Sequence, residues 1–377
     1  MKQKTNIFRN LIIACAFGNL AVFSSSTIAD PFVPTFEELA PGVWAGVRED
    51  NPRNPVMGTA TFVVSDAGVV VYDGGGMPLF AERVIEKIRS VTDKPVTHVA
   101  ISHWHGDHNF GTHPYLEAFP NVQVISHSFT HKVFNSKRIR YIDGYGTGTM
   151  DYKKTVEGYM ETGKDGQGND LTDAHRKYYQ NIIDDAEIVH ADSQRVRVTQ
   201  PTITFDDKLT VVSGNRSIEF MYLGDANTAG DIVMWLPEEK IVATGDIVVV
   251  PVPYLFNVPP RKFSITLQNI NALGYDILVP GHGKIQRDTA YVDLLIEFAD
   301  TIADQRDALL AEGYTDDAAK EKLDFSAFEE RFTGGDPYLT FFFNAWSKRP
   351  FAAAVFKALK GIPMVEIIPE DDPSSNN

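Results

Sequence analysis

The chain has 377 residues, enough for one large core with additions or for two modest domains. Hydrophobic residues make up 43% and charged residues 23% of it, which is ordinary for a globular protein. The formal net charge of -15 argues against a nucleic-acid partner, because proteins that bind phosphate backbones need a basic surface.

The first 29 residues have the three-part pattern of an export signal. Three basic residues precede an apolar run over residues 11–23, and small residues over 24–29 supply a cleavage site before Asp30. The run is too short to span a membrane comfortably. We therefore expect a cleaved signal peptide over residues 1–29, no membrane span, and a periplasmic or secreted mature protein.

The single cysteine, Cys15, lies inside this signal. An alternative is that Cys15 is a lipoprotein processing site, although the apolar run before it is very short. After cleavage at Ala29 no thiol remains. Cysteine then cannot ligate zinc, and any metal must be held by nitrogen and oxygen.

The next elements in chain order are strands and one helix. Residues 44–47, 58–64 and 68–73 predict strands, and residues 79–91 have apolar positions at helical spacing. Residues 96–101 predict another strand. His103 therefore begins a loop at the carboxyl end of a strand, where open α/β sheets bind their ligands.

Residues 128–195 are polar and rich in tyrosine, and we interpret them as an inserted helical or loop segment, a possible lid. Strands are predicted to resume over residues 202–205, 209–212, 218–223, 232–236 and 240–243. A helical period starts at Thr289. We expect one main domain over residues 30–290 and a helical extension over residues 291–377, which ends in a disordered polar tail.

The strongest chemical signal is His103-Trp104-His105-Gly106-Asp107-His108, which holds three of the ten histidines. Two imidazoles two residues apart on a loop can chelate one ion, while Asp107 and His108 can reach a second. Neutral imidazole and carboxylate suit zinc, or iron and manganese where oxygen ligands predominate. We expect Gly106 to let the backbone turn sharply between the two pairs. A solvated polar turn is the alternative, but such turns are seldom built from clustered imidazoles.

The His-x-His-x-Asp-His string after a strand resembles the metal signature of the metallo-β-lactamase superfamily. Asp73 matches the family's aspartate that supports a ligand, Asp246 matches the carboxylate that bridges two metals, and His282 matches the last histidine of the second site. The resemblance covers roughly residues 40–285. It implies an α/β fold, a four-layer αβ/βα sandwich with metals between the edges of two sheets, and one or two zinc ions.

One position departs from this family pattern. Asn227 stands where the family usually has the third histidine of the first site, and an amide oxygen is a weaker ligand for zinc than imidazole. Both sites can fill with a labile first ion, or the second site alone can fill. A neighbour such as Asp225 can replace the missing ligand, although a solvated turn residue is the simpler interpretation of Asp225. Loss of catalysis is a further alternative.

The resemblance implies a hydrolase of a small amide, lactone or ester, with β-lactamases the best-known exported members. We expect hydroxide held between the ions to attack the substrate, and Asp107 to orient that water and move its proton. Trp104 and Tyr254 are candidate walls of the substrate pocket, and Arg261 is a candidate partner for a substrate carboxylate. Packing without substrate contact is the alternative for each.

Two other functional classes remain open. The same scaffold can carry an iron-dependent oxidoreductase or dioxygenase, and a chain whose first site has decayed through Asn227 can bind metal without catalysis. The expected partner is a small-molecule substrate. The sequence predicts neither the substrate's identity nor the oligomeric state.

Overall fold

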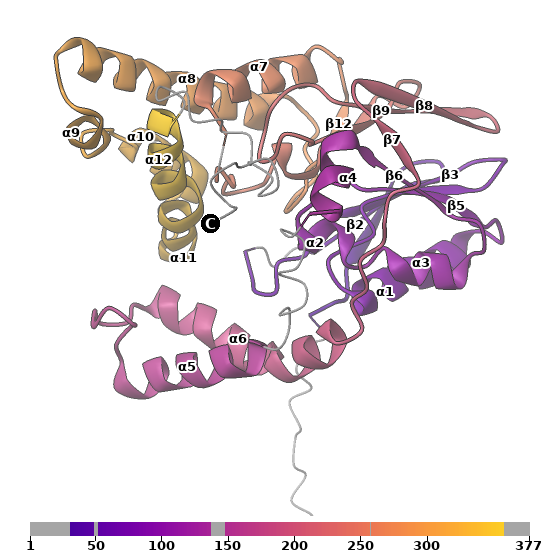
Figure 1. Ribbon diagram of the computed structural model, residues 1–377, viewed down its shortest axis with the longest axis horizontal. Coiled ribbons are helices and arrows are strands. Elements are labelled where there is room, and N and C mark those ends of the chain that lie inside the picture. Colours follow the sequence, from indigo (N-terminus) through magenta and orange to yellow (C-terminus); the bar gives the residue numbers. More distant parts are fainter. Residues whose placement is uncertain (1–30, 49–51, 137–147, 257, 358–377) are drawn as a thin grey trace, which may run out of the picture.

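The computed structural model describes residues 31–48, 52–136, 148–256 and 258–357 (Figure 1). The predicted signal peptide, Cys15 and the polar tail lie outside these described residues. Among the described helices, none combines the length and apolar composition needed to cross a bilayer.

The first sheet has seven strands in sequential order. Neighbours from β1 to β4 pair antiparallel and those from β4 to β7 pair parallel. The strands are β1 (Thr35–Ala40), β2 (Val43–Val47), β3 (Ala60–Val64), β4 (Val69–Tyr72), β5 (Val96–Ala100), β6 (Gln123–His127) and β7 (Ile203–Phe205). The sequence pattern missed β1 and β6. β1 lies at the sheet edge with no buried residue, so it has no alternation of polar and apolar positions.

The second sheet has five strands in the order β12-β11-β10-β9-β8. β11 and β12 pair parallel, and the other neighbours pair antiparallel. The strands are β8 (Lys208–Ser213), β9 (Arg216–Met221), β10 (Val233–Leu236), β11 (Ile241–Ala243) and β12 (Ile277–Val279). All but β12 match predicted strands. β12, Ile277–Val279, was not predicted.

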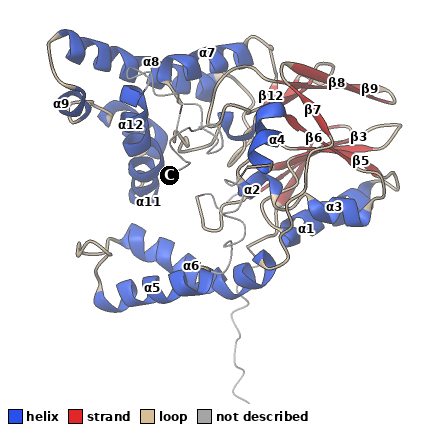
Figure 2. Cartoon of the chain, in the orientation of Figure 1, coloured by secondary structure: helices blue, strands red, loops and turns tan. Residues whose placement is uncertain are grey.

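The two sheets pack face to face, with helices on their outer faces (Figure 2). Successive side chains of β4 point to opposite faces of the first sheet, and both faces are buried. Val70 and Tyr72 enter the core between the sheets, while Val69 and Val71 pack under α1 (Pro78–Val91). α7 (Pro260–Asn271) and α8 (Ala290–Ala311) cover the second sheet. The predicted α/β sandwich of four layers is confirmed.

The segment predicted as an insertion is largely helical. α4 (Ser128–Phe134) lies against β6, and α5 (Thr149–Thr162) and α6 (Asp173–Ser193) form a hairpin that extends away from the sheets (Figure 1). Arg53 forms a two-pronged salt bridge with the buried carboxylate of Asp185 in α6. The hairpin is thereby anchored to the chain that leads into β3.

The residues after α8 form further helices that pack on α8. Phe298 of α8 is fully buried, and its ring contacts five phenylalanine rings at centroid distances of 4.9–6.1 Å. The elements are α9 (Asp316–Lys320), α10 (Ser326–Thr333), α11 (Pro337–Phe342), a π-helical turn (Phe343–Lys348) and α12 (Arg349–Lys357). This aromatic cluster makes the C-terminal helices continuous with the main core.

We expect Phe298→Ala to lower the free energy of unfolding by about 3–5 kcal/mol, because it opens a cavity among packed rings. Chemical denaturation measures this loss. Ala308→Ser, at an exposed position of the same helix, is the matched control and should change stability by roughly 0.5 kcal/mol or less. A loss below about 1 kcal/mol for Phe298→Ala would show that the C-terminal helices do not depend on this cluster.

Candidate metal centre

The predicted metal ligands lie in loops that follow parallel strands. His103 and His105 follow β5, and the short helix α2 (Gly106–Asn109) carries Asp107 and His108. Asp246 lies in a 3₁₀ turn (Gly245–Ile247) after β11, and His282 follows β12. Because these strands end at neighbouring sheet edges, side chains far apart in the sequence meet in one place.

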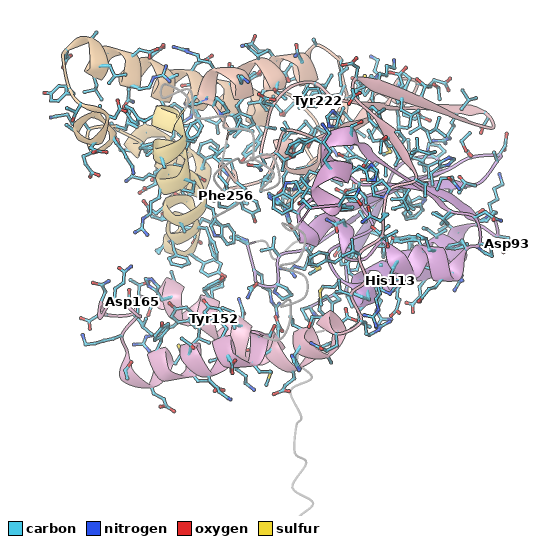
Figure 3. The ribbon with its side chains drawn as sticks, viewed as in Figure 1. Asp93, His113, Tyr152, Asp165, Tyr222 and Phe256 are labelled. Atoms are coloured by element: carbon cyan, nitrogen blue, oxygen red, sulfur yellow. The ribbon has the colours of Figure 1, made fainter. Side chains whose placement is uncertain are left out.

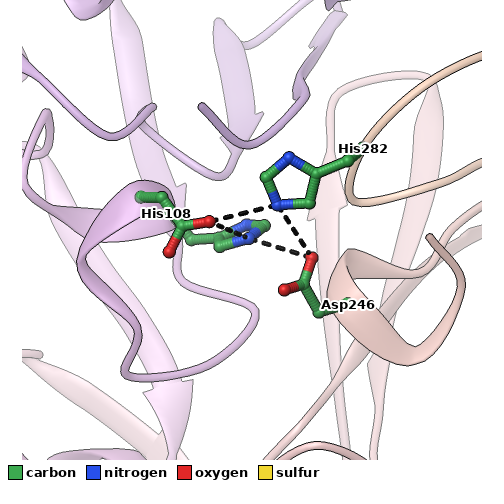
Figure 4. A group of neighbouring side chains, drawn as sticks. His108, Asp246 and His282 are labelled. Atoms are coloured by element: carbon green, nitrogen blue, oxygen red, sulfur yellow. Dashed lines mark ion pairs between the residues drawn. The ribbon is translucent and has the colours of Figure 1, made fainter. Parts of the chain in front are cut away.

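Four of these residues form a compact group (Figure 4). His282 Nε2 lies 3.1 Å from Asp107 Oδ2 and 3.2 Å from Asp246 Oδ1. His108 Nε2 lies 3.1 Å from Asp246 Oδ1 and 3.4 Å from Asp107 Oδ2. Two imidazoles and two carboxylates thus direct one ligand atom each toward a common point.

A second group shares Asp246 with the first. It contains His103, His105 and Asp246. His103 Nε2 lies 2.9 Å from His105 Nδ1 and 3.8 Å from Asp246 Oδ2. Asp246 therefore presents one carboxylate oxygen to each group, which is the arrangement of a carboxylate that bridges two ions.

The donor set fits metal ions. At bond lengths of about 2.0–2.1 Å, neighbouring ligands of a tetrahedral zinc ion lie about 3.3 Å apart, close to the separations in the four-residue group. Three of its atoms, His108 Nε2, Asp246 Oδ1 and His282 Nε2, are buried without a hydrogen-bond partner among the described residues. Buried polar atoms are rarely left unsatisfied, so their convergence indicates a cation-binding position.

Two polar contacts orient the histidine rings. His108 Nδ1 donates to Asp73 Oδ2 at 2.8 Å, while Asp73 Oδ1 accepts from the backbone N–H of Ser102. His103 Nδ1 lies 2.9 Å from Ser102 Oγ. Each contact holds the ring nitrogen that faces away from the centre, so Nε2 is free to face it. Asp73 adopts a left-handed conformation with φ of 60°, a strained backbone of the kind found at functional sites.

Nearby positive charge stabilises the ionised form of the buried Asp246 carboxylate. Burial opposes ionisation of Asp246, but His108 and His282 outweigh it and lower the pKa of Asp246 well below its usual range. Burial lowers the pKa of His103 well below its usual value, so this imidazole is neutral and has a lone pair to offer. A bound cation would supply the positive charge that protons otherwise bring to this group.

Close backbone approach at the centre requires glycine. A Cβ at Gly281 would lie 2.3 Å from Asp246 Oδ1, so a larger residue there would push the His282 loop away. Gly106 was expected to allow a sharp backbone turn between the two pairs of ligands. Its backbone is not left-handed, so the turn does not require glycine for that reason. A Cβ at Gly106 would instead lie 2.3 Å from the Phe110 ring, so the restriction comes from packing.

Asn227 is buried beside the centre. Its Nδ2 donates to the backbone carbonyl of Asp246 at 3.0 Å, and its Oδ1 is buried without a hydrogen-bond partner among the described residues. Asp225, the suggested substitute ligand, lies outside both ligand groups. It accepts hydrogen bonds from the Tyr222 hydroxyl and the Lys262 ammonium group, which hold its carboxylate at the surface of α7.

A cavity of about 450 Å³ opens onto the ligands. Trp104 and Tyr254, two of the predicted pocket residues, line it together with His105, Asp107 and Asp246. Trp104 lines the cavity and also packs in a small core cluster. The remaining lining residues are Asn54, Val56, Gly106, Phe256 and Trp346, and Phe256 lies between the sheets and the C-terminal helices (Figure 3).

The structure places Arg261 away from this cavity. Its guanidinium group is at the surface and pairs with Asp300, Asp304 and Asp307 of α8. The assignment of Arg261 to a substrate carboxylate is therefore not supported by its position. Tyr254 and Phe256 line the cavity, whereas Arg261, in the first turn of α7, faces α8, so closeness in the chain does not bring Arg261 to the site.

Sequence reasoning missed Asn54, Val56 and Trp346. Asn54 and Val56 lie just before β3, and no motif marks them. Trp346 lies in the helical extension, far along the chain from the last predicted ligand. No local pattern connects that extension with the metal centre, and its contribution depends on tertiary packing.

Comparisons with known proteins agree with this geometry. Residues 53–282 match the Metallo-beta-lactamase superfamily. A linear primary-alkylsulfatase from Pseudomonas sp. is 22% identical over 285 residues, 72% of this chain and 50% of that protein. An atrochrysone carboxyl ACP thioesterase from Pseudocercospora fijiensis is 29% identical over 97 residues, 25% of this chain and 28% of that protein.

A solved structure of a double mutant of the sec-alkyl sulfatase PisA1 superposes with a TM-score of 0.59 at 15% identity. The superposition covers 91% of this chain and 52% of the sulfatase chain. This chain thus spans half or less of the curated relatives described above. The family match extends over more than half of the chain and includes both ligand groups, and the chain belongs to the metallo-β-lactamase superfamily.

Proposed function

We propose that the chain is an exported metal-dependent hydrolase that cleaves an ester bond in a small substrate with an apolar part. The observation that carries the proposal is the pair of ligand groups that share Asp246 at the end of a cavity walled by aromatic rings. Such a cavity binds the apolar part of a substrate by excluding water, and the ligand end supplies the chemistry.

A divalent cation held by these residues would lower the pKa of a water molecule toward 7 and polarise the scissile carbonyl. Asp107 is the ligand carboxylate that stays partly exposed, at 20%, and it lines the cavity. It is placed to accept one proton as the water oxygen bonds to the acyl carbon. The acyl–oxygen bond then breaks, and the proton passes from Asp107 to the leaving alkoxide, giving an acid and an alcohol.

A carboxylic ester is the leading substrate class because the described residues that line the cavity include four aromatic rings and no lysine or arginine to pair with an anionic group. The second candidate is a sulfuric ester of an alcohol. It is favoured by the alkylsulfatase match over 72% of this chain and by the structural match over 91%. Comparing p-nitrophenyl carboxylic esters with linear alkyl sulfates distinguishes the two, and turnover of neither would contradict the proposed activity.

We expect the protein dialysed against excess zinc to bind about two ions per chain, one for each ligand group. Asp246→Ala removes the shared carboxylate and should lower this to about one or less, as measured by elemental analysis of folded protein. The group of His103, His105 and Asp246 should release its ion more readily, because Asn227 stands where this site usually has a third imidazole. His131→Ala, a histidine outside both groups, should leave the content unchanged. Two ions in Asp246→Ala would contradict a bridging role.

Asp107→Ala should reduce kcat for the best ester at least about a hundredfold, because it removes the group that moves the proton. Steady-state kinetics at matched metal content measures this, with circular dichroism to verify the fold. Asp304→Ala removes an equal charge from an exposed site and should leave kcat unchanged. If Asp107→Ala retains wild-type turnover, Asp107 has no part in proton transfer.

We propose export from the three-part pattern of residues 1–29. The full chain expressed in a bacterium should yield a mature protein that begins at Asp30, found outside the cytoplasm. N-terminal sequencing and mass spectrometry of the fractionated protein measure this. A protein that retains Met1 in the cytoplasm would contradict export, and a lipid adduct on Cys15 would favour the lipoprotein alternative.

A further inference from the structure

The segment Phe343–Lys348 is a π-helical turn between α11 and α12. A π-helical turn carries one more residue than an α-helical turn, because its hydrogen bonds join residues five apart, and such turns occur often at functional sites. This turn carries Trp346, which lines the cavity at the metal centre. It lies outside residues 53–282, the part of the chain that matches the family.

The turn is attached to the loop that follows the 3₁₀ turn Gly245–Ile247 and precedes α7. The backbone carbonyl of Trp346 accepts a hydrogen bond from the N–H of Leu255 at 3.0 Å. The hydroxyl of Ser347, which is fully buried, donates to the carbonyl of Pro253. Two hydrogen bonds on consecutive residues therefore fix the turn against the loop that carries Tyr254.

The Trp346 ring is held between two other aromatic rings. The Phe342 ring lies behind it at a centroid distance of 4.3 Å, and the Tyr254 ring meets it edge to face at 4.9 Å and 86°. Tyr254 in turn lies 5.2 Å from the ring of His282. This row of rings leads from the C-terminal helices to a metal ligand, and edge-to-face contacts of this kind restrict the rings to one orientation.

Trp346 remains partly exposed, although Phe342 and Ser347 beside it are buried. Leaving a large aromatic ring partly exposed in a concave site is typical of ligand pockets, where the ring covers apolar parts of the ligand. Tyr254 is 6% exposed and Phe342 is 1% exposed, so Trp346 offers the larger free face of this row. The backbone hydrogen bond to Leu255 keeps that face in place without using the side chain.

We propose that Trp346 is a specificity-determining residue whose ring binds the apolar acyl or alkyl group of the substrate opposite the metal ligands. The C-terminal helical region thus forms one wall of the reaction site. The inference rests on the proposed function for the reaction, but the binding of an apolar group by Trp346 can be measured without any turnover.

The kinetic test uses p-nitrophenyl acetate, butyrate and octanoate. For the wild type we expect KM to fall with chain length, because the longer acyl group covers more of the ring. Trp346→Ala should raise KM for octanoate about tenfold or more and change kcat/KM for acetate by less than about twofold. Trp346→Leu keeps apolar volume against Phe342 and preserves the fold if alanine does not. It should give an intermediate KM for octanoate.

The binding test uses the neutral fluorescent probe N-phenyl-1-naphthylamine on the same variants. Its Kd should rise about tenfold in Trp346→Ala and stay within twofold in Tyr314→Ala, which removes an exposed aromatic ring elsewhere in the C-terminal region. Metal content should stay at the wild-type value in all variants, which separates loss of the wall from damage to the ligands.

The outcomes separate the two proposals. If no ester is hydrolysed but the probe binds in a Trp346-dependent way, the proposed reaction fails and the role of Trp346 stands. If octanoate is hydrolysed and its KM and the probe's Kd are unchanged in folded Trp346→Ala and Trp346→Leu, the role of Trp346 is overturned and the proposed reaction stands. A loss of kcat with unchanged KM in these variants would also overturn it.

Discussion

The burial of the Asp246 carboxylate is the constraint around which the site is organised. Asp246 is 5% exposed, and an unpaired carboxylate removed from water costs several kcal/mol. The imidazoles of His103 and His108, from the segment after β5, and of His282, from the loop after β12, surround it. Positive charge, from protons or from bound cations, is what makes such burial stable. A cation bound at this centre would therefore also stabilise the local fold.

The two sheets each supply part of the centre, so their relative position sets its geometry. β5 leads to the first pair of histidines, while β11 and β12 lead to Asp246 and His282. Hydrogen bonds join the sheets at this edge: the Tyr72 hydroxyl donates to the carbonyl of Ile232, and the Thr59 N–H donates to the carbonyl of Gly281. The apolar core between the sheets aligns the strands, and these hydrogen bonds hold the sheet edges together at the metal centre.

The C-terminal helices extend this organisation to the cavity. The aromatic cluster around Phe298 fixes the helices on α8, and the π-helical turn then presents Trp346 beside Tyr254. The hydroxyl of Tyr338 in α11 also donates to the carbonyl of Pro52, which lies close in the chain to Asn54 and Val56 of the cavity lining. The C-terminal helical region thus lines part of the cavity, while the candidate metal ligands lie on the sandwich.

The sequence by itself determined most strands and the ligand types, because these depend on short-range patterns, and the four-layer fold followed from the resemblance of the ligand motif to a known family. Alternation of apolar residues specifies a strand wherever it occurs, and three histidines with an aspartate in six positions indicate a metal centre without knowledge of the rest. Only the tertiary structure decided which side chains face the cavity. Arg261 pairs with α8 and Asp225 pairs with Lys262, while Trp346 reaches the metal centre. Such pairings depend on contacts between residues far apart in the chain, which the local pattern does not encode.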